Sequence, residues 1–230
     1  MELLGDVVAW FDDRANWRGS SGLVHLLGEH VSLSLWAMLI ACAVALPIGL
    51  TLGHLRRGEV VAVNIANIGR AVPSFAVLVF ALQVMSIGRE PALVALVLLA
   101  IPLVLTNAYV GVAGVADDQR EAARGMGMTG WQLLRRVELP SSIPLVMAGI
   151  RTAAVQVVAT ATLGALVGAG GLGLLILRGL RTRDHVEVFA AALVVALLAL
   201  VAEVLLGVAQ RLLTPRGIRG DAARGGDPAI

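Results

Sequence analysis

Long apolar segments separated by short polar stretches make up most of the chain. A helix needs about 20 apolar residues to cross the ~30 Å hydrocarbon core of a bilayer. Five segments reach this length, at about 30–53, 60–86, 91–115, 143–167 and 186–213. The pattern therefore predicts an all-α membrane protein with five core transmembrane helices.

The composition supports a membrane protein and excludes other classes. Hydrophobic residues make up 58% of the chain and charged residues only 15%, whereas a soluble domain carries about a quarter charged residues. The formal charge of +2 is too small to indicate a nucleic-acid partner. The single cysteine, Cys42, cannot form an internal disulfide, and no His/Cys cluster has metal-ligand spacing, so we expect no metal site.

The two ends differ from the central segments. Residues 1–22 lack a basic n-region and a small-residue cleavage site, so we expect a retained interfacial segment with Trp10, Phe11 and Trp17 near the headgroups. Residues 23–214 are predicted to form the transmembrane domain. Residues 215–230 are rich in Gly, Arg and Asp, and are predicted to be a disordered tail. Arginines in the loops favour an outer N-terminus and an inner, cytoplasmic C-terminus.

A polar stretch at 116–142 joins the third and fourth segments and is long for a loop in a compact membrane protein. Asp118 and Glu121 form a D-x-x-E pattern that predicts the start of one short helix. Thr129 and Gln132 form a capping box that predicts the start of a second. We expect Pro140 to end that second helix, and glycines to break the chain between the two: Gly125, Gly127 and Gly130.

The predicted hairpin would offer apolar side chains on the inner face of the membrane, namely Met126, Met128, Trp131, Leu133 and Leu134. Methionine suits an adaptable contact surface. The pattern alone allows two interpretations of the stretch. It is either a docking element for a partner or an ordinary interfacial connector.

The same stretch resembles the EAA signature of binding-protein-dependent ABC importer permeases. The family pattern is E-A-A, three residues, G, nine residues and I-x-L-P, and the chain departs from it only at Val137. The resemblance implies the type I importer permease fold, in which this hairpin docks on the ATP-hydrolysing subunit. It assigns ATPase coupling to Glu121, Ala122, Ala123, Arg124, Gly127, Met128, Leu139 and Pro140.

Three further runs are similar to the osmoprotectant branch of that family: Arg70-Ala71-Val72-Pro73-Ser74, Asn107-Ala108-Tyr109-x-Gly111, and the glycine-rich run 161–173. This resemblance implies a permease for glycine betaine, choline, carnitine or proline. Two alternatives stay open. One is an ABC permease for another small solute, such as an amino acid or a sulfonate, and the other is a stand-alone secondary transporter.

Polar residues within the apolar segments are candidates for the substrate pathway, because polar groups in a membrane are costly unless they are used or paired. The candidates are Arg70, Pro73, Ser74, Asn107, Tyr109, Gln156, Thr160 and Thr162. Only 4% of the residues are aromatic, too few for an obvious cage around a quaternary ammonium group. We therefore expect high-affinity recognition in a separate extracytoplasmic substrate-binding protein.

Two charged residues inside predicted spans each allow two interpretations. Arg151 either makes a structural contact, to the polar stretch or to Glu203, or it contacts the substrate. Glu203 is either a structural pair or the proton relay of a secondary transporter. We favour the structural interpretation for both residues.

The chain has no nucleotide site of its own by sequence. Gly168-x-Gly170-x-x-Gly173 has the spacing of a dinucleotide fingerprint but follows an apolar helix instead of a strand, so it is interpreted as an irregular outer end of the fourth span. No phosphate-loop motif is present. The resemblance thus implies no catalytic residue and no cofactor in this chain, with ATP and Mg²⁺ bound by two partner ATPase subunits. It also implies a second permease copy or related permease, a lipid environment and a place in the bacterial cytoplasmic membrane.

Overall fold

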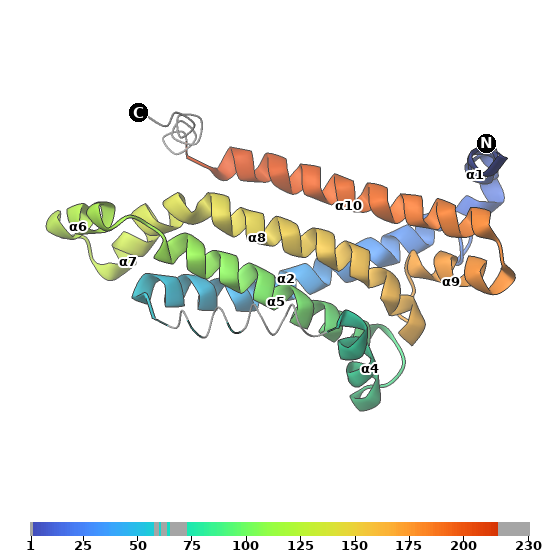
Figure 1. Ribbon diagram of the computed structural model, residues 1–230, viewed down its shortest axis with the longest axis horizontal. Helices are drawn as coiled ribbons and strands as arrows, with labels where there is room; N and C mark the ends of the chain where they lie inside the picture. The colour runs from blue at the N-terminus through green and yellow to red at the C-terminus, as the bar shows by residue number, and fades with distance from the viewer. Residues whose placement is uncertain (1, 58–59, 61–63, 65–72, 216–230) are drawn as a thin grey trace, which may run out of the picture.

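The structure is a computed structural model that describes residues 2–57, 60, 64 and 73–215. All regular elements in these ranges are helices. Figure 1 shows an elongated bundle in which the long helices lie side by side along one axis. The four longest are α2 (Leu23–Leu55), α5 (Arg89–Ala113), α8 (Leu139–Thr160) and α10 (His185–Leu213).

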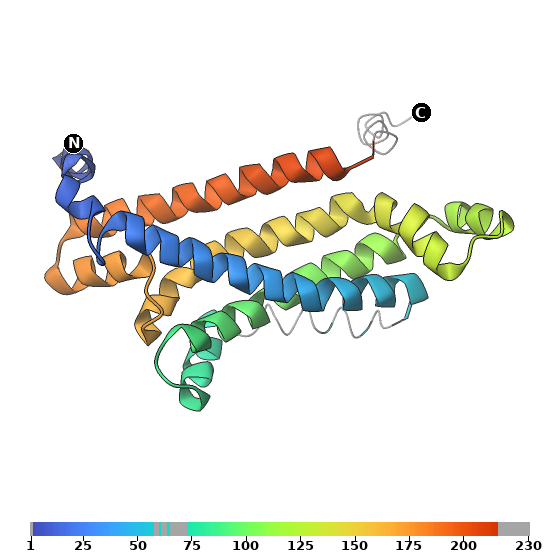
Figure 2. The same ribbon diagram turned by 180° about the vertical axis from the view of Figure 1, so that it is seen from behind.

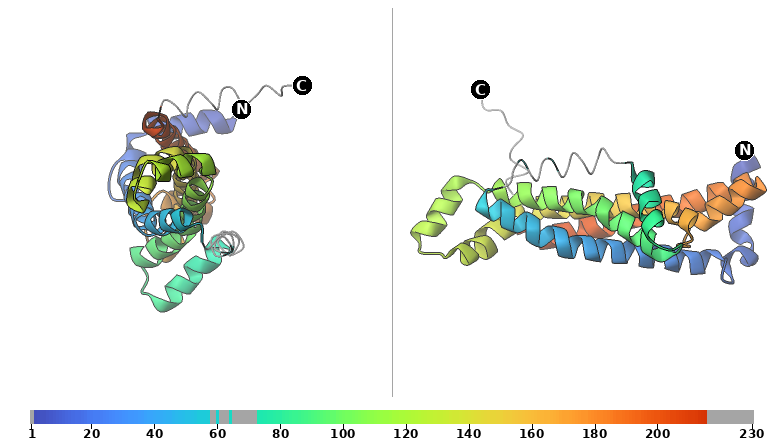
Figure 3. Two further views of the ribbon diagram at one scale, coloured as in Figure 1. Left: turned by 90° about the vertical axis from the view of Figure 1, so that its left-hand side faces the viewer. Right: turned by 90° about the horizontal axis from the view of Figure 1, so that it is seen from below.

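Four continuous helical stretches among the described residues are long and apolar enough to cross a membrane: Leu23–Leu55, Arg89–Ala113, Gly130–Val167 and His185–Leu213. They match the first, third, fourth and fifth predicted spans. The second predicted span is described only in part, by α4 (Ser74–Val84), which lies to the side of the bundle (Figure 3). Most of the first part of that span, including Arg70, lies outside the described residues.

Helices α2 and α5 run in the same direction and form the centre of the core. Small residues at four-residue spacing on α2 allow their backbones to approach closely, and Ala37, Ala41 and Ala45 are fully buried. Further along the same face, a Cβ added to Gly49 would lie 2.7 Å from the carbonyl oxygen of Leu105.

Helix α8 runs antiparallel to α5 and completes the core. A Cβ added to Gly149 would lie 2.4 Å from the Cβ of Asn107, and one added to Gly111 would lie 3.1 Å from that of Ser142. The buried residues from these helices form one apolar cluster with Leu78 of α4. A single core therefore joins α2, α4, α5 and α8.

A second, smaller apolar cluster lies at the end of the bundle where α1 (Glu2–Asp12) is found (Figure 1). Its members come from α2, α9 (Gly173–Thr182) and α10, with Trp10 and Phe11 packed against it. Trp17, in the short 3₁₀ helix Arg14–Trp17, donates from its indole N–H to the Phe11 carbonyl at 2.7 Å. Helix α1 lies across the bundle axis (Figure 2), and its interfacial placement stays a prediction.

Helix α9 was not predicted. It is short and contains glycine and arginine, so it does not form one of the long apolar segments from which the spans were predicted. Leu175 is fully buried in the second cluster, and the Arg178 Nε donates to the Glu187 carboxylate of α10 at 2.6 Å. Helices α9 and α10 thus form a hairpin, in a stretch for which the sequence analysis predicted no element.

The end of the fourth span is irregular, as predicted from its glycines. Helix α8 passes into a 3₁₀ helix, Ala161–Val167, and then into a loop in which Gly168, Gly170 and Gly171 have positive φ. His30 on α2 is fully buried and its Nε2 lies 2.9 Å from the carbonyl oxygen of Val158. The change from α to 3₁₀ geometry alters the backbone hydrogen bonding in the last turn of α8. The His30 ring supplies a hydrogen-bond partner for the Val158 carbonyl there.

The polar stretch 116–142 and the C-terminal end of α10 lie at one end of the bundle, opposite α1 (Figure 1). This arrangement agrees with termini on opposite sides of a membrane. Which end faces the cytoplasm stays a prediction from the arginine distribution.

Candidate coupling hairpin and pathway

The polar stretch forms the helical hairpin that the sequence predicts, although its first helix begins differently. Helix α6 runs over Asp117–Gly125, and its N-cap is Ala116 without a side-chain cap. The D-x-x-E interpretation of Asp118 was therefore wrong. Asp117 and Asp118 instead lie in the first turn, where negative charge is favoured by the helix dipole.

The turn of the hairpin depends on Gly127, as predicted. Gly127 has φ +78°, the left-handed region that costs residues with a Cβ about 1–2 kcal/mol. Its N–H donates to the Arg124 carbonyl at 2.9 Å, and the Met128 N–H donates to Ala123 at 3.2 Å. The turn thus satisfies the carbonyls at the end of α6.

The second helix of the hairpin begins with the predicted capping box. Thr129 Oγ1 accepts from the Gln132 N–H at 3.4 Å, and Gln132 Oε1 accepts from the Thr129 N–H at 2.8 Å. Helix α7 (Gly130–Leu133) then continues through a π-helical segment, Leu134–Glu138, into α8.

The prediction that Pro140 ends this helix was wrong. Pro140 lies in the first turn of α8, and Gly130–Val167 is one continuous helical stretch. The π-helical segment explains the difference, because its i→i+5 bonding, with the Leu139 N–H donating to Leu134, accommodates a residue that has no N–H of its own. The hairpin is therefore joined to the fourth span without an intervening loop.

The hairpin exposes part of the surface that the sequence predicts. Met126 and Trp131 are 71% and 68% exposed. Exposed residues at the coupling positions are Glu121, Ala122, Arg124 and Gly127, whereas Met128, Leu139 and Pro140 are half-buried. Ala123 and Leu133 are almost fully buried, so the prediction of Leu133 as contact surface was wrong. We refer to the exposed side chains of Met126 and Trp131 as the candidate docking patch.

A buried charged cluster, which the sequence did not reveal, lies at the base of the hairpin. Glu138 is fully buried, and its Oε2 lies 2.6 Å from Nδ1 of His54, near the end of α2. Nη1 of Arg120 in α6 lies 3.2 Å from the other carboxylate oxygen. These three residues come from separate parts of the chain, and no local pattern connects them.

Arginines hold the hairpin to the ends of α2 and α5. Arg120 donates to the carbonyl of Val112 at 2.6 Å, near the end of α5. Burial lowers the pKa of the Arg120 guanidinium, while the Glu138 carboxylate acts in the opposite direction. Arg56, the C-cap of α2, pairs with Asp117 and donates to the Val115 carbonyl at 3.0 Å.

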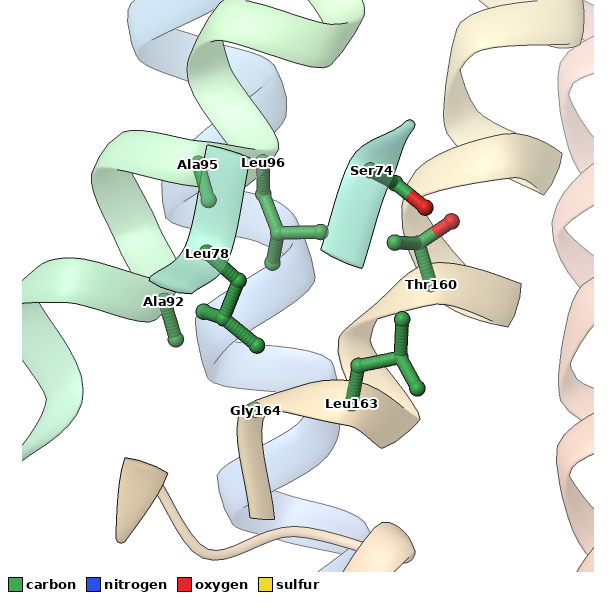
Figure 4. A pocket seen from close by; sticks show the side chains of 8 residues that line it. All are labelled: Ser74, Leu78, Ala92, Ala95, Leu96, Thr160, Leu163 and Gly164. Carbon is green, nitrogen blue, oxygen red and sulfur yellow. The ribbon is translucent and has the colours of Figure 1, made fainter. Parts of the chain in front are cut away.

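Two of the predicted pathway residues lie together. Ser74, the first residue of α4, and Thr160, the last residue of α8, line a small cavity and point toward one another (Figure 4). Its volume of about 10 Å³ is enough for roughly one water molecule. Pro73, the N-cap of α4, lies next to Ser74 and is exposed. The cavity is therefore too small for an organic solute in this conformation.

The other predicted pathway residues do not reach this cavity. Asn107 donates to the Leu103 carbonyl of its own helix at 2.8 Å, and Thr162 donates to the Ala159 carbonyl at 2.7 Å. Tyr109 is 6% exposed and belongs to the main core, while Gln156 is exposed on α8. Arg70 lies outside the described residues.

The two charged residues within the spans form the ion pair that the structural interpretation predicts. Arg151 Nη2 lies 2.7 Å from Glu203 Oε1. Arg151 also donates to the side chain of Gln210 at 3.0 Å, so the contact joins α8 to α10. The expectation that Arg151 contacts Glu203 is confirmed.

Several long apolar helices around one core, with an exposed helical hairpin at one end, define a multi-span membrane protein. The comparison with known families agrees and specifies the class. Residues 45–219 match the family described as the binding-protein-dependent transport system inner membrane component. The chain belongs to this family and is an inner-membrane protein.

Curated relatives cover most of the chain. It is 37% identical over 198 residues to the glycine betaine/carnitine/choline transport system permease protein OpuCB of Bacillus subtilis, a match that covers 86% of this chain and 91% of the relative. It is 41% identical over 199 residues to the carnitine transport permease protein OpuCB of Listeria monocytogenes, with the same coverage.

Solved structures share the fold. An inward-facing structure of the MetNI methionine ABC transporter matches with a TM-score of 0.73 and 23% identity, covering 84% of this chain and 96% of the other. An amino acid ABC transporter matches with a TM-score of 0.65 and 19% identity, covering 82% and 92%. The predicted all-α permease fold of the type I importers is therefore confirmed.

Proposed function

We propose that the chain is the permease subunit of an ATP-driven importer for an osmoprotectant: glycine betaine, choline, carnitine or proline. The observation that carries the proposal is the similarity of most of the chain to permeases named for glycine betaine, carnitine and choline transport. The exposed docking patch at Met126 and Trp131 supports coupling to a partner.

ATP hydrolysis belongs to separate subunits in this proposal. Two ATPase subunits bind ATP and Mg²⁺ and contact the hairpin through the docking patch and the exposed coupling residues, of which Glu121 and Arg124 carry charge. Small side chains permit the close approach, with Ala122 exposed and Gly127 at the turn. ATP-driven closure of those subunits then moves the hairpin and the helices joined to it.

The substrate pathway forms against a second permease subunit, either another copy or a related chain. The small cavity lined by Ser74 and Thr160 supports a pathway along this side of α4 and α8. The further candidates are Pro73, Asn107, Tyr109, Gln156, Thr162 and Arg70. An extracytoplasmic binding protein delivers the solute. A secondary transporter using Glu203 as a proton relay is disfavoured, because Glu203 is paired with Arg151.

Uptake measurements test the proposal. Labelled glycine betaine, choline, carnitine and proline are supplied at high osmolarity to cells with and without this gene, with the partner subunits expressed. Two hairpin variants, Met126→Glu and Gln119→Glu, form a matched pair, because each adds one negative charge at an exposed position of the hairpin.

We expect gene-dependent uptake of at least one of these solutes, which Met126→Glu abolishes and Gln119→Glu preserves. Equal uptake by both variants, at equal membrane levels, would contradict the assigned docking patch. Uptake of an amino acid or a sulfonate alone would contradict the substrate class. Uptake that persists without the ATPase would contradict the ATP-driven mechanism.

A further inference from the structure

Glu138 is the centre of the buried charged cluster at the base of the hairpin. It has 0% exposure, and it lies at the end of the π-helical segment that joins α7 to α8. A π-helical turn adds one residue to the turn and changes the face that the following residues present, and such turns are frequent at functional sites. The segment thus brings a carboxylate into the interior at the junction between hairpin and span.

The partners of Glu138 come from two other elements. His54 approaches Oε2 at 2.6 Å from the last turn of α2, and Arg120 approaches Oε1 at 3.2 Å from α6. A buried carboxylate is costly without partners, and removing one member of a buried charged pair leaves the others uncompensated. The cluster therefore favours one arrangement of α2, α6 and the helix that leads into α8.

The ring of His54 also contacts the second helix of the hairpin. A Cβ added to Gly130, the first residue of α7, would lie 3.3 Å from Nε2 of His54. The ring is thus held between the beginning of α7 and the Glu138 carboxylate. Arg120 also connects the cluster to the end of α5, because it donates to the Val112 carbonyl.

We propose that Glu138 is a positioning residue that makes the hairpin and the inner end of α2 move as one body. Through His54 and Arg120 it joins the docking element to α2, α5 and α8, so that displacement of the hairpin moves three core helices together. This inference rests on the proposed function for its consequence in transport. The attachment itself is a property of this chain alone.

An exposed ion pair between the same elements provides the matched control. Arg56 at the C-cap of α2 pairs with Asp117 of α6, and the Asp117 side chain is 71% exposed. Exposed ion pairs contribute little to stability. Glu138→Gln and Asp117→Asn each neutralise one carboxylate that links the hairpin to α2, but only Glu138→Gln removes a member of the buried cluster.

The first experiment measures the attachment directly. Spin labels are placed on Leu55→Cys, in the last turn of α2, and on Gln119→Cys, in α6, in a Cys42→Ser background. Both label positions are exposed. The distance distribution between the labels is then recorded for the purified chain in lipid nanodiscs.

We expect a single narrow distribution in the otherwise wild-type chain and in Asp117→Asn, and a broad one in Glu138→Gln. A broad distribution without any cluster substitution overturns the proposal, and so does a narrow one in Glu138→Gln. Even if Glu138→Gln fails to fold, a broad distribution in the chain without a cluster substitution still overturns the proposal.

The second experiment measures coupling in the complete transporter with its ATPase and binding-protein partners. We expect Glu138→Gln to lower the solute transported per ATP hydrolysed by about twofold to thirtyfold, while ATP hydrolysis without the binding protein stays at the wild-type rate. His54→Gln retains a donor for Glu138 and is expected to stay closer to wild type than His54→Leu.

A wild-type ratio of transport to hydrolysis in Glu138→Gln overturns the proposal. If the proposed function is wrong, the result is different, because the wild-type transporter would then take up none of the osmoprotectants. In that case the label distances still decide whether Glu138 attaches the hairpin to α2.

Discussion

Arg151 and Glu203 form an ion pair between α8 and α10, with Nη2 and Oε1 2.7 Å apart. Gln210 extends the contact, since its side chain accepts from Arg151 and donates to the Pro144 carbonyl at 3.1 Å. Helix α10 is the least buried of the four candidate spans among the described residues, because only 17% of its most apolar 18-residue segment is buried. These polar contacts therefore matter more for its position than they would in a tightly packed helix.

Glu203→Leu is expected to lower the free energy of unfolding by about 1–3 kcal/mol, because it leaves Arg151 unpaired within a span. Both side chains are about a third exposed, so the cost stays below the 3–5 kcal/mol typical of fully buried pairs. The double variant Arg151→Met/Glu203→Leu removes both charges and should regain most of the loss. Thermal stability of the purified protein in detergent measures both effects.

The same double variant distinguishes the two interpretations of Glu203. A structural pair predicts that uptake survives its replacement by apolar residues. A proton relay predicts that uptake is lost even when the protein remains stable. Loss of uptake in a stable double variant would therefore contradict a purely structural role for the pair.

The close approach of α2 to α5 gives a second prediction. Gly49→Ala would place a Cβ 2.7 Å from the Leu105 carbonyl oxygen and 2.8 Å from the Cβ of Ala108. Neither is the flexible end of a side chain, so the helices must shift, at a cost of about 1–3 kcal/mol. We expect a lower melting temperature in detergent and a smaller folded fraction in membranes.

Gly28→Ala is the control for this packing effect. Gly28 lies in the same helix, and a Cβ there meets nothing within 4 Å. Alanine at such a position should stabilise the helix by about 0.5–1 kcal/mol. Equal stability of the Gly49 and Gly28 variants would show that α2 and α5 do not pack closely at Gly49.

The turn of the hairpin gives a third prediction. Gly127→Ala forces a Cβ into the left-handed region at φ +78°, which costs about 1–2 kcal/mol. Gly125 ends α6 and, like Gly127, has open space around it. Gly125→Ala therefore adds the same methyl group without the backbone strain. We expect weaker co-purification of the ATPase with Gly127→Ala than with Gly125→Ala. Equal co-purification would show that the turn is not needed for docking.

The sequence was sufficient where the determinant is local. The capping box of Thr129 and Gln132 depends on residues three positions apart, and it forms as predicted. The turn at Gly127 follows from the one residue type that tolerates positive φ. Long apolar runs likewise located four spans, because length and hydropathy are properties of the segment itself.

The sequence was insufficient where distant elements decide the outcome. Glu138 and His54 are far apart in the chain, and only the packing of the hairpin on α2 brings them within 2.6 Å. Pro140 usually indicates a helix end, but the π-helical segment before it accommodates the missing N–H. Leu133 has the apolar character of a contact residue, but its side chain is only 1% exposed once the chain is folded.

The small cavity between Ser74 and Thr160 gives the last prediction. It has room for roughly one water molecule in this conformation, so a pathway along this side has to open during transport.

In a Cys42→Ser background, Thr160→Cys introduces a thiol of similar size at the cavity. We expect a small, charged thiol reagent to modify it slowly at rest and faster when ATP, the binding protein and its solute are present. Val157→Cys, a turn earlier and fully buried in the core, should stay unreactive in both conditions. Equal reactivity of Thr160→Cys with and without transport would place the pathway elsewhere, and the exposed Gln156 on the same helix would then be the next position to label.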